Sequence, residues 1–278
     1  GIYTDLGTKE LRQMLFEAGR IEYLYSFSNE KFFFPDVHHS FKFTLLGAQR
    51  GEPSDGFWAT FRFNPRVAVA PEELATFLAS RKNQVYIRLD SLSRFSPGSL
   101  SVMEFQAQTD YTVADALYAE HPLLGDVSCA WWVELDNEFH FTNDRKLLNQ
   151  HGMGYPLIEG KTINQFDANY GAYHFWANID DPSVSAEARM QLNTYRVAHR
   201  RIARTTDART LIAAIVAPQT ACEVNATVAL IRGSEDEQLK LFLCAALNSF
   251  VLDYIIRYKV STTLNMFYLY QLPLPRRT

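Results

Sequence analysis

The segment that most restricts the possible folds is an arginine-rich stretch that runs directly into an apolar one. Residues 196–218 read RVAHRRIARTTDARTLIAAIVAP, with five arginines against one acid, Asp207. The residues from Leu211 to Ala217 are all apolar, which is typical of a buried strand. The simplest interpretation is a hairpin of two strands joined by the turn Thr205-Thr206-Asp207-Ala208.

The first strand of this hairpin is expected to display guanidinium groups. Arg196, Arg200 and Arg204 share a face in a strand or a helix, because a spacing of four is even and close to one helical turn. Neighbouring guanidiniums would lie roughly 13 Å apart on a strand and about 6 Å apart on a helix. A guanidinium matches phosphate oxygens and guanine edges, so the stripe indicates a polyanion as partner. The alternative is a solvated basic face with internal ion pairs.

Length, charge and cysteine content limit the number of domains, the kind of partner and the redox setting. A chain of 278 residues with 20 Phe and 14 Tyr suits two packed domains better than one. A net charge of −4 argues against binding nucleic acid over the whole surface and still allows one basic face. Three scattered cysteines predict neither a disulfide framework nor a zinc site, which fits a reducing, cytoplasmic setting. The sequence contains no run of about 18 apolar residues, so we expect no membrane partner.

Periodicity predicts further elements along the chain. Helices are expected at 8–18, 109–120, 182–193 with Asp181 as N-cap, and 235–259, the last being long and apolar in its middle. Strands are expected at 21–27, 41–46, 57–69, 85–89 and within 131–144. The chain opens as if inside a domain, so we expect it to be a piece of a longer protein.

An aromatic loop between the first two expected strands carries the first resemblance. Its Phe34-Pro35 pair, followed by a strand, is similar to motif VIII of the gamma-class adenine-N6 DNA methyltransferases. In those enzymes the aromatic residue stacks on the base flipped out of the duplex, which compensates for part of the lost base stacking. The alternative is that Phe32, Phe33 and Phe34 are ordinary core or rim aromatics.

Three later motifs follow in order: PLIEGKTINQFD, the arginine-rich segment, and LNSFVLDYIIRYKVSTTLNMFYLYQLPLP. Together they resemble the C-terminal half of the Eco57I-like family. These are fused restriction-modification methyltransferases of the type IIG/IIL kind, with related phage-defence adenine methyltransferases. The resemblance implies an α+β fold in three parts. Residues 1–65 would be the tail of a Rossmann-like methyltransferase sheet and 66–125 a connector. Residues 126–278 would be a mixed, strand-rich target recognition domain with a long C-terminal helix.

The resemblance also implies what lies elsewhere. The sequence has no glycine-rich S-adenosylmethionine loop and no (Asn/Asp/Ser)-Pro-Pro-(Tyr/Phe/Trp) motif. The cofactor, S-adenosylmethionine, and the catalytic residues would therefore belong to the parent protein, and we expect this chain alone to be inactive. Its partners would be double-stranded DNA and the missing N-terminal methyltransferase domain.

Site residues follow from the motifs and from side-chain chemistry. Gln and Asn can read adenine, and Lys or Arg can contact guanine or phosphate. The expected DNA-binding residues are Lys161, Gln165, Asn169, Arg196, Arg200, Arg204 and Arg209. Thr205, Thr206, Asp207 and Thr210 are expected to support the hairpin, and Phe34 with Pro35 to stack on a flipped base.

Two other functions fit parts of the sequence. The chain could be a non-catalytic DNA specificity subunit that works with separate proteins. Alternatively, Asp144 with Glu159-Gly160-Lys161 resembles the D…ExK arrangement of magnesium-dependent nucleases.

Overall fold

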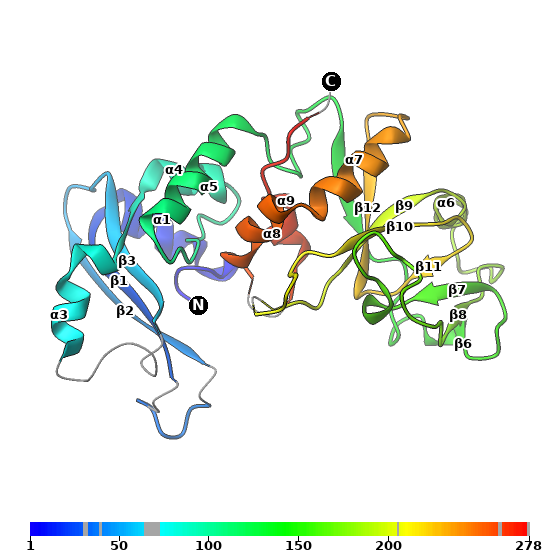
Figure 1. The fold of residues 1–278 in the computed structure, drawn as a ribbon, viewed down its shortest axis with the longest axis horizontal. Coiled ribbons are helices and arrows are strands. Elements are labelled where there is room, and N and C mark those ends of the chain that lie inside the picture. Colours follow the sequence, from blue (N-terminus) through cyan, green and yellow to red (C-terminus); the bar gives the residue numbers. More distant parts are fainter. Residues whose placement is uncertain (30–32, 39–40, 64–72, 205, 261–262, 277–278) are drawn as a thin grey trace. The chain divides into compact units, whose positions relative to one another are not determined.

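The chain folds into two compact units in a computed structural model that describes residues 1–29, 33–38, 41–63, 73–204, 206–260 and 263–276. The first unit is Gly1–Glu120 and the second is His121–Thr278 (Figure 1). Both combine helices with sheets, as expected for an α+β protein. Each unit is described separately below.

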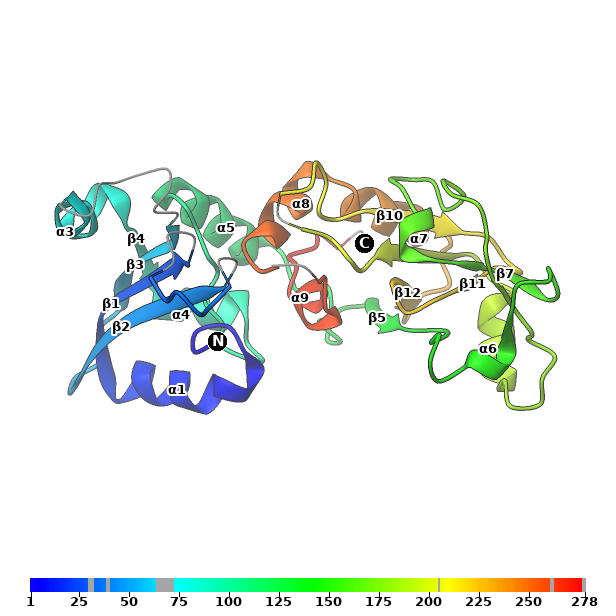
Figure 2. The same ribbon diagram turned by 90° about the horizontal axis from the view of Figure 1, so that it is seen from below.

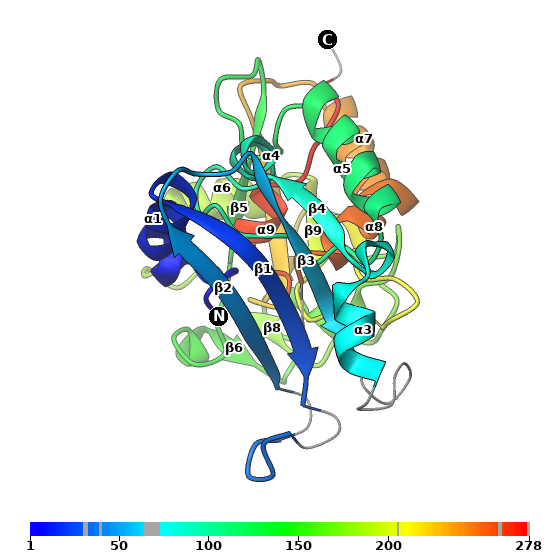
Figure 3. The same cartoon turned by 90° about the vertical axis from the view of Figure 1, so that its left-hand side faces the viewer.

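The first unit is built on one sheet with the strand order β2-β1-β3-β4 (Figure 3). Neighbouring strands run antiparallel except for the parallel pair β1–β3. Cross-strand neighbours such as Leu24 with Ala59 and Phe57 with Ile87 are buried and form part of its core. The methyltransferase assignment of this mixed sheet stays a prediction. The strands are β1 (Gly19–Ser28), β2 (Lys42–Arg50), β3 (Gly56–Phe63) and β4 (Val85–Arg88).

The helices expected near 8–18 and 109–120 are confirmed as α1 and α5. Much of the expected connector belongs to the first unit, because β4 hydrogen-bonds to β3 and α4 and α5 pack against it. The helical segments are η1 (Leu6–Thr8), α1 (Lys9–Glu17), α3 (Leu74–Ala79), η3 (Arg81–Asn83), α4 (Leu89–Phe95) and α5 (Gln108–Glu120).

The second unit has a main antiparallel sheet with the order β10-β9-β12-β5. The predicted hairpin is confirmed: β9 and β10 pair antiparallel, with Ala198 opposite Ala214. Its connection runs from Arg201 to Ile212, longer than the four-residue turn expected. The strands are β5 (Trp132–Asp136), β9 (Arg196–Arg200), β10 (Ala213–Val216) and β12 (Ala226–Arg232).

A smaller sheet with the order β11-β7-β8-β6 lies at the end of this unit that also holds α6 (Figure 2). Leu192 of α6 packs with Leu157 and Ala177 of this sheet in one core cluster. The N-cap of α6 is Ser185, not Asp181 as expected, because the Asp181 carboxylate accepts from Ser183 in a preceding turn. The elements are η4 (Arg145–Leu147), β6 (Leu148–Asn149), β7 (Tyr155–Ile158), η5 (Gly160–Thr162), β8 (Trp176–Ala177), α6 (Ala186–Leu192) and β11 (Ala221–Cys222).

The prediction of a single long C-terminal helix at 235–259 is wrong. The segment forms two helices, α7 (Gln238–Leu247) and α8 (Phe250–Arg257), with a bend of 53° between them. They are followed by α9 (Met266–Tyr270). The Asn248 side chain at the break donates to Ala213 O (2.7 Å) and accepts from Ala213 N (3.1 Å), while Ser249 caps α8. The helix breaks because Asn248 is bound to the backbone of β10.

Within the described residues, no helix by itself is long and apolar enough to cross a membrane. Of the helices in the described ranges, α7 and α8 meet that length and composition when taken together across their bend.

Candidate nucleic-acid interface

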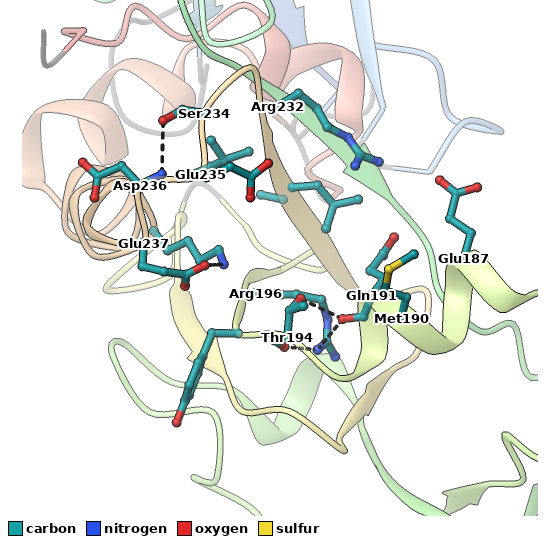
Figure 4. A pocket seen from close by; sticks show the side chains of 15 residues that line it. Glu187, Met190, Gln191, Thr194, Arg196, Arg232, Ser234, Glu235, Asp236 and Glu237 are labelled. Carbon is teal, nitrogen blue, oxygen red and sulfur yellow. Dashed lines mark hydrogen bonds and ion pairs between the residues drawn. The ribbon is translucent and has the colours of Figure 1, made fainter.

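Strand β9 does not display its first arginine to solvent, which corrects the expectation of an exposed stripe. Arg196 is 1% exposed, and its Nε donates to Glu138 Oε1 at 2.7 Å. Its Nη1 donates to the carbonyls of Leu192 (3.3 Å) and Thr194 (2.7 Å), and its Nη2 to that of Thr220. Figure 4 shows the guanidinium bound to the chain just after α6. Arg196 is therefore a structural residue that caps α6, not a DNA contact.

Glu138 completes a buried ion pair with Arg196. Its second carboxylate oxygen accepts from Cys222 N at 2.8 Å, so the pair joins β9 to β11. Burial raises the pKa of Glu138, and the neighbouring Arg196 opposes that rise. A buried carboxylate that lost this arginine would have no cation to compensate it.

The expectation that Arg209 contacts DNA is also corrected by the structure. Its Nη2 donates to the carbonyls of Asn248 (2.5 Å) and Ser249 (3.1 Å), at the end of α7. Its guanidinium carbon lies 4.6 Å from the centre of the Phe250 ring, and its Nε lies 3.6 Å from the Asp253 carboxylate. These contacts stabilise the break between α7 and α8 and leave the side chain largely buried.

The residues expected to support the hairpin lie in the β9–β10 connection. Asp207 Oδ2 accepts from Arg204 N at 2.9 Å, and the Thr210 hydroxyl donates to Arg204 O at 2.9 Å. Thr210 N also donates to the buried Asp253 carboxylate at 2.7 Å. Thr206 is exposed, and Thr205 lies outside the described residues. Their role in support stays a prediction, which these hydrogen bonds favour.

The other arginines of this segment differ from Arg196 and Arg209. Within the part of the chain that the structure describes, no carboxylate forms an ion pair with Arg200, Arg201 or Arg204. Arg200 Nε donates to the carbonyl of Ile202 at 3.1 Å, and Arg204 is exposed. Their charges are therefore available to an external anion.

The segment 158–168 brings other expected residues to the same end of the sheet. Its Ile163 and Ala168 pack in one core cluster with Ala198 of β9. Alternate residues of a strand share a face, so Arg200 projects on the side that this segment covers.

Lys161 lies close to this group through the loop at Asn225. The carbonyl of Asn225 accepts from Arg201 N at 2.9 Å, and a Cβ on Gly160 would lie 2.4 Å from that oxygen. Only glycine permits this approach. Lys161, next in the chain, is 63% exposed and pairs with Glu159 at 2.9 Å. We call Lys161, Gln165, Arg200 and Arg201 the strand-end surface, whereas Arg204 lies four residues beyond β9 in the connection to β10.

The two expected base readers have different surroundings. The side-chain amide of Gln165 has no hydrogen-bond partner among the described residues, so both its donor and its acceptor are available. Asn169 is exposed, and its Oδ1 already accepts from the Tyr173 hydroxyl, which occupies one of its two acceptor positions. Gln165 is the better placed of the two to read adenine bidentately.

The residues of the nuclease alternative have local partners. The Glu159 carboxylate pairs with Lys161 and, at 2.7 Å, with His174 Nδ1. Asp144 Oδ2 accepts from His140 N at 2.8 Å. Among the described residues, no three His, Cys, Asp or Glu side chains form a group that could hold a metal ion.

The Phe34-Pro35 loop of the first unit is fixed by one buried side chain. Asn29 donates to the carbonyls of Phe34 (3.0 Å) and Val37 (2.6 Å) and accepts from Phe34 N (3.0 Å). The Phe34 ring meets the Phe43 ring edge-on at 5.1 Å, yet Phe34 is 49% exposed. Figure 3 shows the loop beyond the paired ends of β1 and β2. An aromatic face is therefore held in place and open to solvent.

Comparison with known proteins gives likenesses among solved structures alone. Neither a scan of protein-family models nor a search of curated proteins finds a match. Among solved structures, the chain is similar to the type IIG restriction endonuclease BpuSI, with 14% identity and a TM-score of 0.42. The match covers 99% of this chain and 39% of the BpuSI chain, so the chain spans well under half of that neighbour's length. At this TM-score, the likeness assigns no role to any residue.

A pocket of about 340 Å³ lies between α6, β12 and the segment that leads into α7 (Figure 4). Its acidic lining consists of Glu187, Glu235, Asp236 and Glu237. Its two partly buried cations are paired, Lys240 with Glu237 at 2.6 Å and Arg232 with Glu134 at 2.6 Å. This charge does not suit a polyanion, so the pocket is not part of the candidate interface.

Arg201 was not among the residues singled out from the sequence, although it lies inside the arginine-rich segment. The four-residue spacing favoured Arg196, Arg200 and Arg204, and Arg201 is out of step with them. Its position is decided by the end of β9, where the backbone turns toward Asn225. A charge count over the segment would have included it.

Proposed function

We propose that this chain is the DNA sequence-recognition portion of an adenine-N6 DNA methyltransferase or restriction-modification enzyme. The observation that carries the proposal is a set of guanidiniums, those of Arg200, Arg201 and Arg204, that form no ion pair among the described residues. Arg200 and Arg201 lie at the end of β9, where Asn225 bonds to Arg201 and packs against Gly160, the neighbour of Lys161. Cations without carboxylate partners can neutralise phosphates without first breaking an ion pair. The ordered motifs that resemble the Eco57I-like family support the same conclusion.

The proposal divides the work between two kinds of contact. The cations of the strand-end surface would contact phosphates and set the register of the protein on the duplex. The free amide of Gln165, on the same surface, would read a base edge in the major groove. Asn169 would contribute mainly its amide donor, because its oxygen already accepts from Tyr173.

The first unit would supply the aromatic wall for a flipped adenine. Phe34 supports this role because its ring is anchored on Phe43 and remains half exposed. A flipped base needs a rigid aromatic face, since a mobile ring would lose entropy on stacking. Catalysis and S-adenosylmethionine belong to the parent protein in this proposal, and no residue of this chain is assigned to either.

Salt-dependent binding tests the proposal. We expect the full chain to bind a fluorescent 30-bp duplex with an affinity that falls steeply between 50 and 300 mM NaCl, measured by anisotropy. Replacing Arg200 and Arg201 with alanine should reduce the slope of log K against log salt by about 1.8, since each lost phosphate contact contributes about 0.9. Neither side chain forms an ion pair among the described residues, so the fold should persist.

The matched control is Arg145→Ala with Lys146→Ala. These cations of η4 are exposed and lie outside the strand-end surface. We expect this double variant, with the same loss of charge, to keep the wild-type slope. Negligible, salt-independent binding by the wild-type chain would refute the proposal. Equal effects of the two double variants would refute the assignment of the surface.

A further inference from the structure

The turn after η5 places an aromatic residue at a corner where glycine is usual. Asp167 N donates to Asn164 O at 3.0 Å, and Asn164 N donates to Asp167 O at 2.8 Å. Gln165 and Phe166 therefore occupy the two corner positions of a β-turn. Phe166 has φ +62°, in the left-handed region that strains any residue with a Cβ.

The fold holds this backbone but does not bury the ring. Phe166 N donates to Ala213 O at 2.9 Å, and Ile163 and Ala168 anchor both sides of the turn in the core. The side chain is 64% exposed, and no aromatic ring packs on it within the described residues. Neither backbone preference nor burial explains a phenylalanine here. Strain that the surrounding structure maintains is characteristic of functional sites.

The charged surroundings indicate the kind of partner. Phe166 N donates to Ala213 O, and Arg200 N donates to the neighbouring Ile212 O, so the turn with this exposed ring lies beside the end of β9 that carries Arg200. Cations that contact a phosphate backbone, combined with a solvent-exposed aromatic ring, form the usual platform for stacking on unpaired bases. In a duplex such a ring stacks where a base step is opened. An exposed ring in a protein–protein interface would need apolar neighbours instead.

We infer that Phe166 stacks on a base that is unstacked from the bound duplex, beside the base whose edge Gln165 reads. The strained turn fixes the backbone so that the ring stays outside the protein core before DNA arrives, and no backbone rearrangement is needed on binding. This inference rests on the proposed function and adds a residue that none of the sequence motifs assigned.

Phe166→Gly separates stacking from stability. Glycine adopts φ +62° without strain, so the urea midpoint of the full chain should stay the same or rise. Loss of one stacked base should weaken binding about 5- to 150-fold. The probe is a 30-bp duplex enriched from a random-sequence library by the wild-type chain, and binding is measured by anisotropy. Tyr195→Ala, another exposed aromatic of the second unit, is the matched control and should bind as the wild type does.

Phe166→Trp gives a second, spectroscopic readout. Tryptophan can stack in place of phenylalanine, so affinity should be retained. Bound DNA should quench the added tryptophan, over and above any change seen for the four native ones.

The outcomes distinguish this inference from the proposed function. Suppose that the wild-type chain binds DNA with a steep salt dependence and that Phe166→Gly binds equally tightly. This result would overturn the inference and leave the proposed function standing. A lower urea midpoint for Phe166→Gly, with no added quenching in Phe166→Trp, would assign Phe166 a structural role and also overturn it. If the wild-type chain enriches no duplex, the inference and the proposed function are both refuted.

Discussion

Replacing Arg196 with methionine should destabilise the second unit, because Arg196 is the only cation among the described residues in an ion pair with Glu138. The Glu138 side chain is 4% exposed and would retain only Cys222 N as a hydrogen-bond donor from the backbone. Removing one partner of a buried ion pair costs about 3–5 kcal/mol. Methionine keeps much of the apolar stem, so most of this loss should be electrostatic.

The measurement is the free energy of unfolding in urea at pH 7, followed by tryptophan fluorescence. A Trp58→Phe background removes the signal of the first unit and leaves Trp131, Trp132 and Trp176 in the second. Adding Glu138→Gln to Arg196→Met should restore about 1–3 kcal/mol, because the uncompensated charge disappears while an oxygen remains for Cys222 N. This coupling distinguishes a broken ion pair from a packing defect.

A loss below about 0.5 kcal/mol for Arg196→Met, typical of an exposed surface position, would refute this reasoning. So would a double variant that is no more stable than Arg196→Met alone. Arg196 would then be free enough to contact DNA, as the spacing of the arginines first predicted.

Two further predictions concern stability. Burial lowers the pKa of His199 to about 4 from 6.5, so the folded state resists the proton that the unfolded state takes up. The wild-type free energy of unfolding should fall by about 3 kcal/mol more than that of His199→Leu as the pH drops from 7 through 4, measured by urea titration at each pH; parallel curves would contradict it. Asn248→Ala should cost about 2–4 kcal/mol, because the Ala213 backbone loses its partners. Ser249→Ala should cost only about 1 kcal/mol as a lost N-cap, and equal losses would show that the bonds from Asn248 to β10 contribute little.

Local pattern predicted much of the secondary structure. The apolar run before Pro218 is strand β10, and the helical spacing near the N-terminus is α1. Both predictions depend on periodicities that a few neighbouring residues establish by themselves. The long C-terminal helix failed for the opposite reason: nothing next to Asn248 in the sequence indicates that its amide binds a strand 35 residues away.

The sequence by itself determined that arginines cluster in one segment and that an apolar strand follows them. Only the tertiary structure decided which of those arginines face an external partner. Arg196 and Arg204 are both arginines of the same predicted stripe. Arg196 is buried and donates to Glu138, 58 residues earlier in the chain, while Arg204 is exposed. The positive φ of Phe166 is likewise set by β10 and by the core on either side of the turn. Periodicity is a property of neighbours in the chain, whereas burial and charge compensation depend on residues that only folding brings together.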